Sequence, residues 1–163
     1  MKGRVVSNAG PIIALSSIER VNILRELFEE VIVPEDVHFE VIHGGKSYAG
    51  LESYLNAKWI RVVSPSTPID PLLGTLVGKG EASVIHLARE GRADLALIDE
   101  KKARKIARKI YGIRVIGSVR VLVEAKHRGF VSSVRVALEE MRLAGYWVHD
   151  DIVRAALKQA KEE

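Results

Sequence analysis

The sequence DLALIDEKKARKIARKIYGIRVI, residues 94–116, decides the fold because it predicts a strand, a helix and a second strand in succession. Residues 94–98 and 113–116 are short runs rich in Leu, Ile and Val, which are typical of buried strands. Residues 100–111 between them carry apolar side chains at helical spacing. A helix that joins two such strands forms a βαβ unit, in which the strands are parallel and the helix covers one face of the sheet.

The same alternation runs through most of the chain. Further strands are predicted at residues 4–7, 30–33 and 59–63, and further helices at residues 12–28, 35–42, 47–57, 81–90, 119–127, 133–143 and 150–161. Gly10-Pro11 is expected to break the chain before the first helix, and residues 64–74, which hold three of the five prolines, are expected to form a loop. We therefore predict one α/β domain over residues 1–163, a three-layer fold with a central parallel sheet flanked by helices and extra C-terminal helices.

The composition bounds the class of protein. Of the 163 residues, 47% are hydrophobic and 28% are charged, which is ordinary for a globular domain and excludes a disordered chain. The absence of cysteine excludes disulfides, zinc–cysteine clusters and thiol nucleophiles, and it suits a reducing, cytoplasmic location. No apolar run approaches the roughly 18 residues of a membrane span. A single glutamine, three asparagines and many charged residues favour a heat-adapted source.

The charge is unevenly distributed along the chain. Residues 1–82 hold 8 basic and 10 acidic side chains, whereas residues 83–163 hold 17 basic and 11 acidic ones. The isoelectric point near 9.4 and a basic second half indicate a polyanionic partner such as nucleic acid, although a well-solvated surface would have the same composition. The strongest cluster is the predicted helix at 100–111, whose basic residues Lys101, Lys102, Arg104, Lys105, Arg108 and Lys109 are expected on its exposed sides.

Several polar residues are predicted at the carboxyl edge of the sheet, where open parallel sheets bind ligands. Asn8 follows the first strand, and Asp99 and Glu100 follow the strand at 94–98. Glu40 and Glu81 share the apolar stripes of their helices, so both lean inward.

Each of these residues also has a purely structural interpretation. Asn8 and Asp99 would serve as helix N-caps, Glu81 as an acid at a helix N-terminus, and Glu40 as a surface residue. Their convergence on one edge favours a divalent cation site, because oxygen ligands of this kind select Mg²⁺ or Mn²⁺.

Four stretches, residues 5–13, 33–40, 78–82 and 97–104, together resemble the PIN-like nucleases, and most closely a prokaryotic PIN-like family of unknown function. The resemblance covers about residues 3–130, with a helical addition at about 131–163. It implies a Rossmann-like fold and Mg²⁺- or Mn²⁺-dependent cleavage of single-stranded RNA. Relatives often form homodimers, and many are toxins held inactive by a small antitoxin protein.

The resemblance also implies roles for individual residues. Glu40, Glu81 and Asp99 fall on the acidic positions that hold the metal and catalyse the reaction, with Glu100 as an auxiliary acid. Asn8 stands where the family pattern has an aspartate, and it is expected to ligate the metal through its amide oxygen. The phosphate-binding residues are expected to be Lys101, Lys102, Arg104 and Lys105.

Three functions follow from these patterns. The favoured one is a metal-dependent endoribonuclease that leaves a 5′-phosphate and a 3′-hydroxyl. The alternative is a catalytically impaired module of the same fold that binds RNA or protein, because Asn8 replaces the first acid. A nucleotide-binding regulator is less favoured, because residues 74–80 are one residue short of a phosphate loop. Tyr146-Trp147, which precedes the last helix, is expected to serve packing or an oligomer contact.

Overall fold

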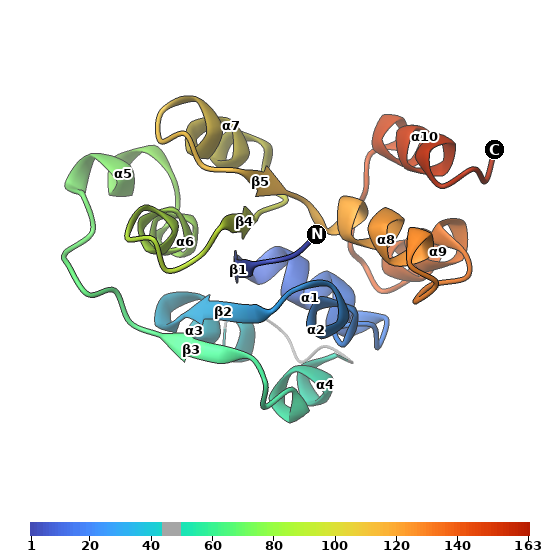
Figure 1. Ribbon diagram of the computed structural model, residues 1–163, viewed down its shortest axis with the longest axis horizontal. Coiled ribbons are helices and arrows are strands. Elements are labelled where there is room, and N and C mark those ends of the chain that lie inside the picture. The colour runs from blue at the N-terminus through green and yellow to red at the C-terminus, as the bar shows by residue number, and fades with distance from the viewer. Residues whose placement is uncertain (44–49) are drawn as a thin grey trace.

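The computed structural model describes residues 1–43 and 50–163, and this part of the chain contains a central five-stranded sheet. All strand pairs are parallel, and the strand order across the sheet is β3-β2-β1-β4-β5. The strands are β1 (Arg4–Ser7), β2 (Glu30–Pro34), β3 (Arg61–Val63), β4 (Leu95–Leu97) and β5 (Val115–Ile116). Figure 1 shows the sheet between helices, so the predicted α/β fold with a parallel sheet is confirmed.

Strand β1 lies in the middle of the sheet. Its Val5 pairs with Val31 of β2 on one side and with Leu95 of β4 on the other, and all three side chains are buried. A strand covered by helices on both faces must be apolar throughout, and the short runs of Val, Ile and Leu meet this requirement. The polar residues that follow the strands therefore gather at the carboxyl edge of the sheet.

Helices cover both faces of the sheet. The helices of the described residues are α1 (Ala9–Ser17), α2 (Ile23–Leu27), α3 (Glu35–His43), α4 (Leu51–Asn56), α5 (Pro71–Leu76), α6 (Lys79–Arg89), α7 (Lys101–Lys109), α8 (Ser118–His127), α9 (Val134–Leu143) and α10 (Asp150–Gln159). Helix α6 packs on β1, β2 and β4, and α7 packs on β5, whereas α2 and α3 pack on β2. Right-handed crossovers place these two sets of helices on opposite faces. Helix α3 also contacts α6, and this contact brings residues of both helices to the candidate site.

The start of the first helix differs from the prediction. Gly10 and Pro11 lie inside the first turn of α1 rather than before it, and the stretch predicted as one helix at 12–28 contains two, α1 and α2. Proline is tolerated in a first turn because the N–H groups there have no partner within the helix. Asn8 occupies the N-cap position, as its structural interpretation required.

The predicted loop at 64–74 also differs, because its end forms α5. The carboxylate of Asp70 accepts a hydrogen bond of 2.9 Å from the backbone N–H of Leu72, and Pro71 opens the helix. Helix α6 then begins at Lys79, two residues earlier than predicted. The predicted helix at 47–57 is partly confirmed by α4, and residues 47–49 of that prediction lie outside the described residues.

The C-terminal helices α8, α9 and α10 pack together, as Figure 1 shows, and α8 and α9 also contact α1. Glu162 fastens this group by folding back onto the start of α9. Its carboxylate accepts hydrogen bonds from the backbone N–H groups of Val134 and Arg135 and from the ammonium of Lys126. None of the helices within residues 1–43 and 50–163 has the length and apolar character needed to cross a bilayer.

Candidate active site

Asn8 is the buried polar residue at the centre of the site. Its side chain is 7% exposed, and its own N–H donates to the Leu97 carbonyl at 2.9 Å, which places Asn8 beside the end of β4. Although Asn8 stands at an N-cap position, its side chain makes no cap hydrogen bond, and its Oδ1 atom has no partner among the described residues. A buried acceptor without a donor costs free energy, so this oxygen is suited to a ligand.

Glu40 of α3 and Gly80 of α6 meet at the Asn8 amide. A Cβ atom at Gly80 would lie 2.9 Å from Oε2 of Glu40 and 3.2 Å from Oδ1 of Asn8. The absence of a side chain at Gly80 therefore lets the two oxygens approach the same point against the first turn of α6. The three positions come from different elements, and the structure brings them together as the sequence predicted for Asn8 and Glu40.

Glu40 is an exposed residue, although its position on an apolar stripe predicted that it leans inward. Partial burial, and next the negative charge of Glu81, raise the pKa of the Glu40 carboxyl above its usual range. Within residues 1–43 and 50–163 this carboxylate has neither a hydrogen bond nor an ion pair. No neighbouring cation therefore lowers the pKa of Glu40 again. Two acidic side chains and an unpaired amide oxygen are hard ligands, and they fit a divalent cation such as Mg²⁺ or Mn²⁺.

Glu81 directly follows Gly80 in the first turn of α6. Its Oε2 atom is 2.6 Å from the point where a Cβ at Gly78 would stand, so the carboxylate curves back over the start of α6. Gly78 is the N-cap of α6 and has an extended backbone, which is the turn that presents Glu81 to the site. The positive end of the helix favours a carboxylate here.

A groove of about 720 Å³ opens beside these acids. It is lined by Glu35, Asp36, Phe39, Glu40, Gly78, Lys79, Gly80 and Glu81. The Phe39 side chain is 65% exposed, and the Lys79 ammonium lies 3.4 Å from the Asp36 carboxylate. Sequence reasoning missed Phe39, which directly precedes Glu40, and Lys79, which stands two residues before Glu81. An exposed aromatic ring and a cation beside acidic ligands are suited to a base and a phosphate of a nucleic acid.

Asp99 is held by donors of the protein. Its Oδ1 accepts from the backbone N–H of Ser118 at 2.7 Å, and its Oδ2 accepts from the Ser118 hydroxyl at 2.7 Å and from the Tyr146 hydroxyl. Sequence reasoning missed both donors. The packing expected for Tyr146 is confirmed, because its ring packs against the core, and its hydroxyl serves in addition as a donor to Asp99. Burial, followed by the charge of Asp99, raises the pKa of Tyr146, so this phenol stays protonated as a donor. The described part of the chain contains no preformed group of three or more His, Asp or Glu side chains arranged to hold a metal.

Glu100 is the N-cap of α7, a role that the structural interpretation gave to Asp99. Its carboxylate accepts from the backbone N–H groups of Lys102 at 3.1 Å and Ala103 at 2.6 Å. Glu100, predicted as an auxiliary acid of the site, therefore caps α7 with its carboxylate.

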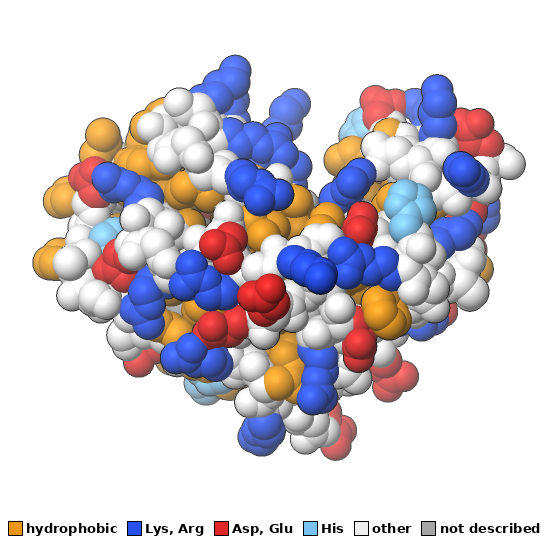
Figure 2. All heavy atoms as spheres, viewed as in Figure 1, with side chains coloured by type: hydrophobic (Ala, Val, Ile, Leu, Met, Phe, Trp, Pro, Cys, Tyr) orange, Lys and Arg blue, Asp and Glu red, His pale blue; other side chains and the backbone are white. Residues whose placement is uncertain are grey.

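The basic residues of α7 lie on the surface with one exception. Figure 2 shows Lys and Arg side chains gathered over α7, and Lys101, Lys102 and Lys105 are exposed. Arg104 instead turns inward, where its Nη1 donates to the Ile98 carbonyl at 2.9 Å. Burial, and next the charge of Arg108, lower its pKa. The phosphate-binding role predicted for Arg104 assumed an exposed side chain, and in the structure this side chain is half-buried.

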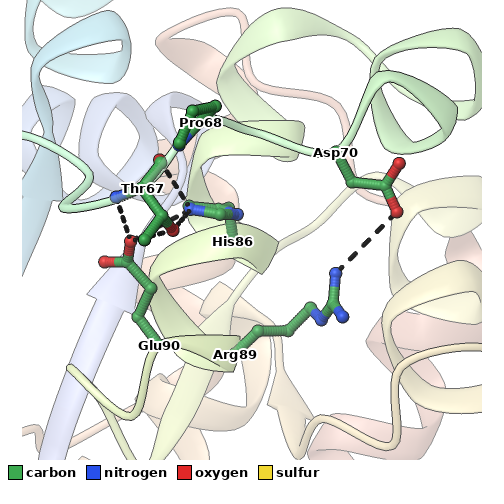
Figure 3. Close-up of a pocket in the computed structure, with 6 residues that line it drawn as sticks. All are labelled: Thr67, Pro68, Asp70, His86, Arg89 and Glu90. Carbon is green, nitrogen blue, oxygen red and sulfur yellow. Dashed lines mark hydrogen bonds and ion pairs between the residues drawn. The ribbon is translucent and has the colours of Figure 1, made fainter.

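A second pocket, of about 340 Å³, lies at the other end of α6 (Figure 3). Nε2 of its His86 lies 3.0 Å from Oε1 of Glu90, which also accepts from the Thr67 backbone N–H and hydroxyl. Burial by itself would raise the pKa of Glu90, but the hydrogen bonds from Thr67 and Ser66 and the charge of His86 lower it to about 2. These hydrogen bonds connect the loop before α5 to helix α6, so the residues of this pocket have a structural role.

The comparisons with known proteins agree with this geometry. The family model described as DUF3368, a PIN domain, matches residues 4–162. No curated protein matches the chain. PIN domains have a nuclease-type fold and typically use divalent metal ions. Because the match spans almost the whole chain, the protein belongs to the PIN-domain family DUF3368, as the resemblance of its motifs predicted.

Proposed function

We propose that this chain is a Mg²⁺- or Mn²⁺-dependent endoribonuclease that hydrolyses phosphodiester bonds of single-stranded RNA. The observation that carries the proposal is the buried Oδ1 atom of Asn8, which has no hydrogen-bond partner among the described residues and faces the Glu40 carboxylate. An acceptor facing an acid is unfavourable in the protein alone, and a divalent cation would satisfy both groups.

Asn8, Glu40 and Glu81 would supply oxygen ligands to the cation, and Asp99 would join them from the neighbouring strand end. When bound, the cation neutralises charge on the phosphate and lowers the pKa of a water molecule. The hydrogen bonds from Ser118 and Tyr146 hold the Asp99 carboxylate in one orientation.

The basic residues would hold the RNA. Lys101, Lys102 and Lys105 extend into solvent from α7, and cations in such positions bind the phosphate backbone regardless of sequence. Arg104 would act from its inward position by balancing the charge of Asp99. In the reaction a water oxygen forms a bond to phosphorus while the bond from phosphorus to the 3′-oxygen breaks. The 3′-oxygen takes up a proton, which leaves a 3′-hydroxyl and a 5′-phosphate.

A second candidate function is an impaired PIN module that binds RNA or protein without cutting it. It is favoured by the three donors on Asp99, which already satisfy most of that carboxylate, and by the neutral amide at Asn8. In this function the basic surface of α7 would bind RNA by itself.

The proposal extends to the setting in which the protein works. We propose that it is cytoplasmic, acts as a homodimer and is the toxin of a toxin–antitoxin pair with a small protein partner. The exposed side chains of Leu143 and Trp147 are candidate contact residues for either protein partner.

The test is cleavage of end-labelled single-stranded RNA by purified protein in EDTA, Mg²⁺ or Mn²⁺. Asp99→Asn and Glu40→Gln should remove cleavage, whereas Glu139→Gln, at an exposed acid of α9, should leave it unchanged. Cleavage that persists in EDTA or in Asp99→Asn would contradict the proposal. If the wild type leaves the RNA intact but shifts it on a gel as strongly as Asp99→Asn does, the binding module replaces the nuclease.

A further inference from the structure

We infer that Tyr146 is a positioning residue for Asp99, so that the segment between α9 and α10 completes the active site. The inference rests on the proposed function, in which Asp99 takes part in metal binding. The Tyr146 hydroxyl donates to Oδ2 of Asp99 across a sequence separation of 47 residues. A hydrogen bond between the helical addition and the carboxyl edge of the sheet joins two parts of the fold that the sequence keeps far apart.

The hydrogen bonds on Asp99 leave room for one more contact, and they determine where it lies. An ionised carboxylate has about four acceptor positions. Oδ2 receives two donors, the hydroxyls of Ser118 and Tyr146, whereas Oδ1 receives only the backbone N–H of Ser118 from the described residues. The remaining acceptor position is therefore on Oδ1. By occupying Oδ2, the phenol fixes which oxygen is available to a cation.

The approach of the phenol depends on a glycine in α1. A Cβ atom at Gly10 would lie 3.2 Å from the Tyr146 hydroxyl oxygen, which is closer than ordinary van der Waals contact. Glycine at the second position of α1 therefore leaves room for the Tyr146 hydroxyl beside Asp99. Helix α1 also carries Asn8 at its N-cap, so the phenol lies between two proposed ligand-bearing elements.

The segment that carries Tyr146 is held on both sides. The backbone N–H of Tyr146 donates to the Met141 carbonyl at 2.9 Å. Arg142 donates to the Val148 carbonyl at 2.6 Å and to Asp150 at 2.7 Å, and its guanidinium lies 5.0 Å from the ring centre of Trp147. These contacts place the hydroxyl on Asp99 without help from a ligand.

The test compares Tyr146→Phe, which removes one oxygen and keeps the ring, with Tyr111→Phe, the same change at a half-buried tyrosine that lies beside Arg89 of α6. Mn²⁺ binding to the full chain is measured by isothermal titration calorimetry, and kcat and KM are measured on single-stranded RNA. Loss of a hydrogen bond to a metal ligand typically costs about tenfold or more in metal affinity or activity. We expect Tyr146→Phe to raise the Kd for Mn²⁺ and lower kcat by about this factor with KM unchanged. Tyr111→Phe should match the wild type.

Equal Mn²⁺ affinity and kcat in Tyr146→Phe and the wild type would overturn the inference. Asp99→Asn separates this failure from failure of the proposed function. If Asp99→Asn loses Mn²⁺ and Tyr146→Phe does not, only the positioning role is wrong; if neither loses Mn²⁺, the metal site is wrong. Should Tyr146→Phe melt early, Gly10→Ala displaces the hydroxyl with the phenol intact and should weaken Mn²⁺ binding in the same way.

Discussion

The side-chain oxygens of Asn8 and Glu40 converge on one point beside the backbone of α6. A Cβ atom at Gly80, the second residue of that helix, would be 3.2 Å from the first oxygen and 2.9 Å from the second. The candidate site is thus built around a position that has no side chain, and this arrangement can be tested directly.

Gly80→Ala should weaken the site without weakening the fold. The new methyl group would push the Glu40 carboxylate away, and we expect Mn²⁺ affinity and cleavage to fall by about tenfold. Thermal stability should stay level, because the nearest atom to the new methyl group, Oε2 of Glu40, is the far end of a flexible side chain that can move aside. The matched control is Gly74→Ala in α5, where a Cβ would have no neighbour within 4 Å and cleavage should be unchanged. A Gly80→Ala variant with full activity would show that the convergence is incidental.

Asn8→Asp should strengthen the proposed site by adding a negative charge at this position. With a further carboxylate beside Glu40, Mn²⁺ affinity should rise by about tenfold, because ligand charge sets the affinity of such sites. Without metal the same variant should melt at a lower temperature, because two like charges then face each other. Calorimetry and thermal melts with and without Mn²⁺ measure both effects. Asn56→Asp, at the exposed end of α4, is the control, and an affinity that falls in Asn8→Asp would exclude a ligand role for this side chain.

Phe39→Ala should weaken RNA binding more than catalysis. The ring is exposed on the groove beside Glu40, and stacking of a base on an aromatic side chain is worth about 1–3 kcal/mol. We expect KM for single-stranded RNA to rise at least about fivefold while Mn²⁺ affinity stays constant. Phe130→Ala, which removes a partly exposed ring outside the groove, should leave KM unchanged. Equal KM values for the two variants would argue against stacking on Phe39.

Glu162→Gln should lower stability in a pH-dependent way. Burial by itself would raise the pKa of Glu162, but hydrogen bonds from Lys126, Arg135, Val134 and Ser133 lower it from 4.5 to about 2. The stabilisation is therefore fully present above pH 4.5 and is lost as the pH falls toward 2. Urea unfolding at pH 7 should show a loss of about 2 kcal/mol for Glu162→Gln, because hydrogen bonds to a charged group are lost.

At pH 3 the difference between Glu162→Gln and the wild type should be smaller than at neutral pH. Glu163→Gln, at the exposed neighbouring residue, should match the wild type at both pH values. If the difference in unfolding free energy between Glu162→Gln and the wild type is as large at pH 3 as at pH 7, the carboxylate charge contributes little to stability.

The sequence was sufficient for the sheet and for part of the site. The strands are short apolar runs, so their positions and parallel pairing followed from the pattern alone. Asn8 and Asp99 could be placed because residues after parallel strands share one edge. Ser118 could have been found by the same rule, because it comes two residues after β5.

Other features depend on contacts that no local pattern encodes. Tyr146 reaches Asp99 from a distant segment, and nothing in its neighbourhood distinguishes it from a packing residue. Arg104 was expected on the outer face of α7, but the carbonyl of Ile98 draws its guanidinium inward. Ile110 belongs to the apolar side chains at helical spacing within residues 100–111, but it follows the last helical residue, Lys109, and is 57% exposed.

The central position of β1 has a consequence for how the molecule folds. The first strand of the chain needs Val31 on one side and Leu95 on the other, so its pairing joins segments far apart in sequence. Closing the long loops between such contacts costs entropy before the contacts stabilise the fold, and proteins rich in such contacts fold slowly. Asn8, Glu40 and Gly80 come from the end of β1, from α3 after β2 and from α6 before β4, so the proposed cation site forms only when the long-range pairing is complete. Recovery of Mn²⁺ binding during refolding should therefore follow the slowest phase of the reaction.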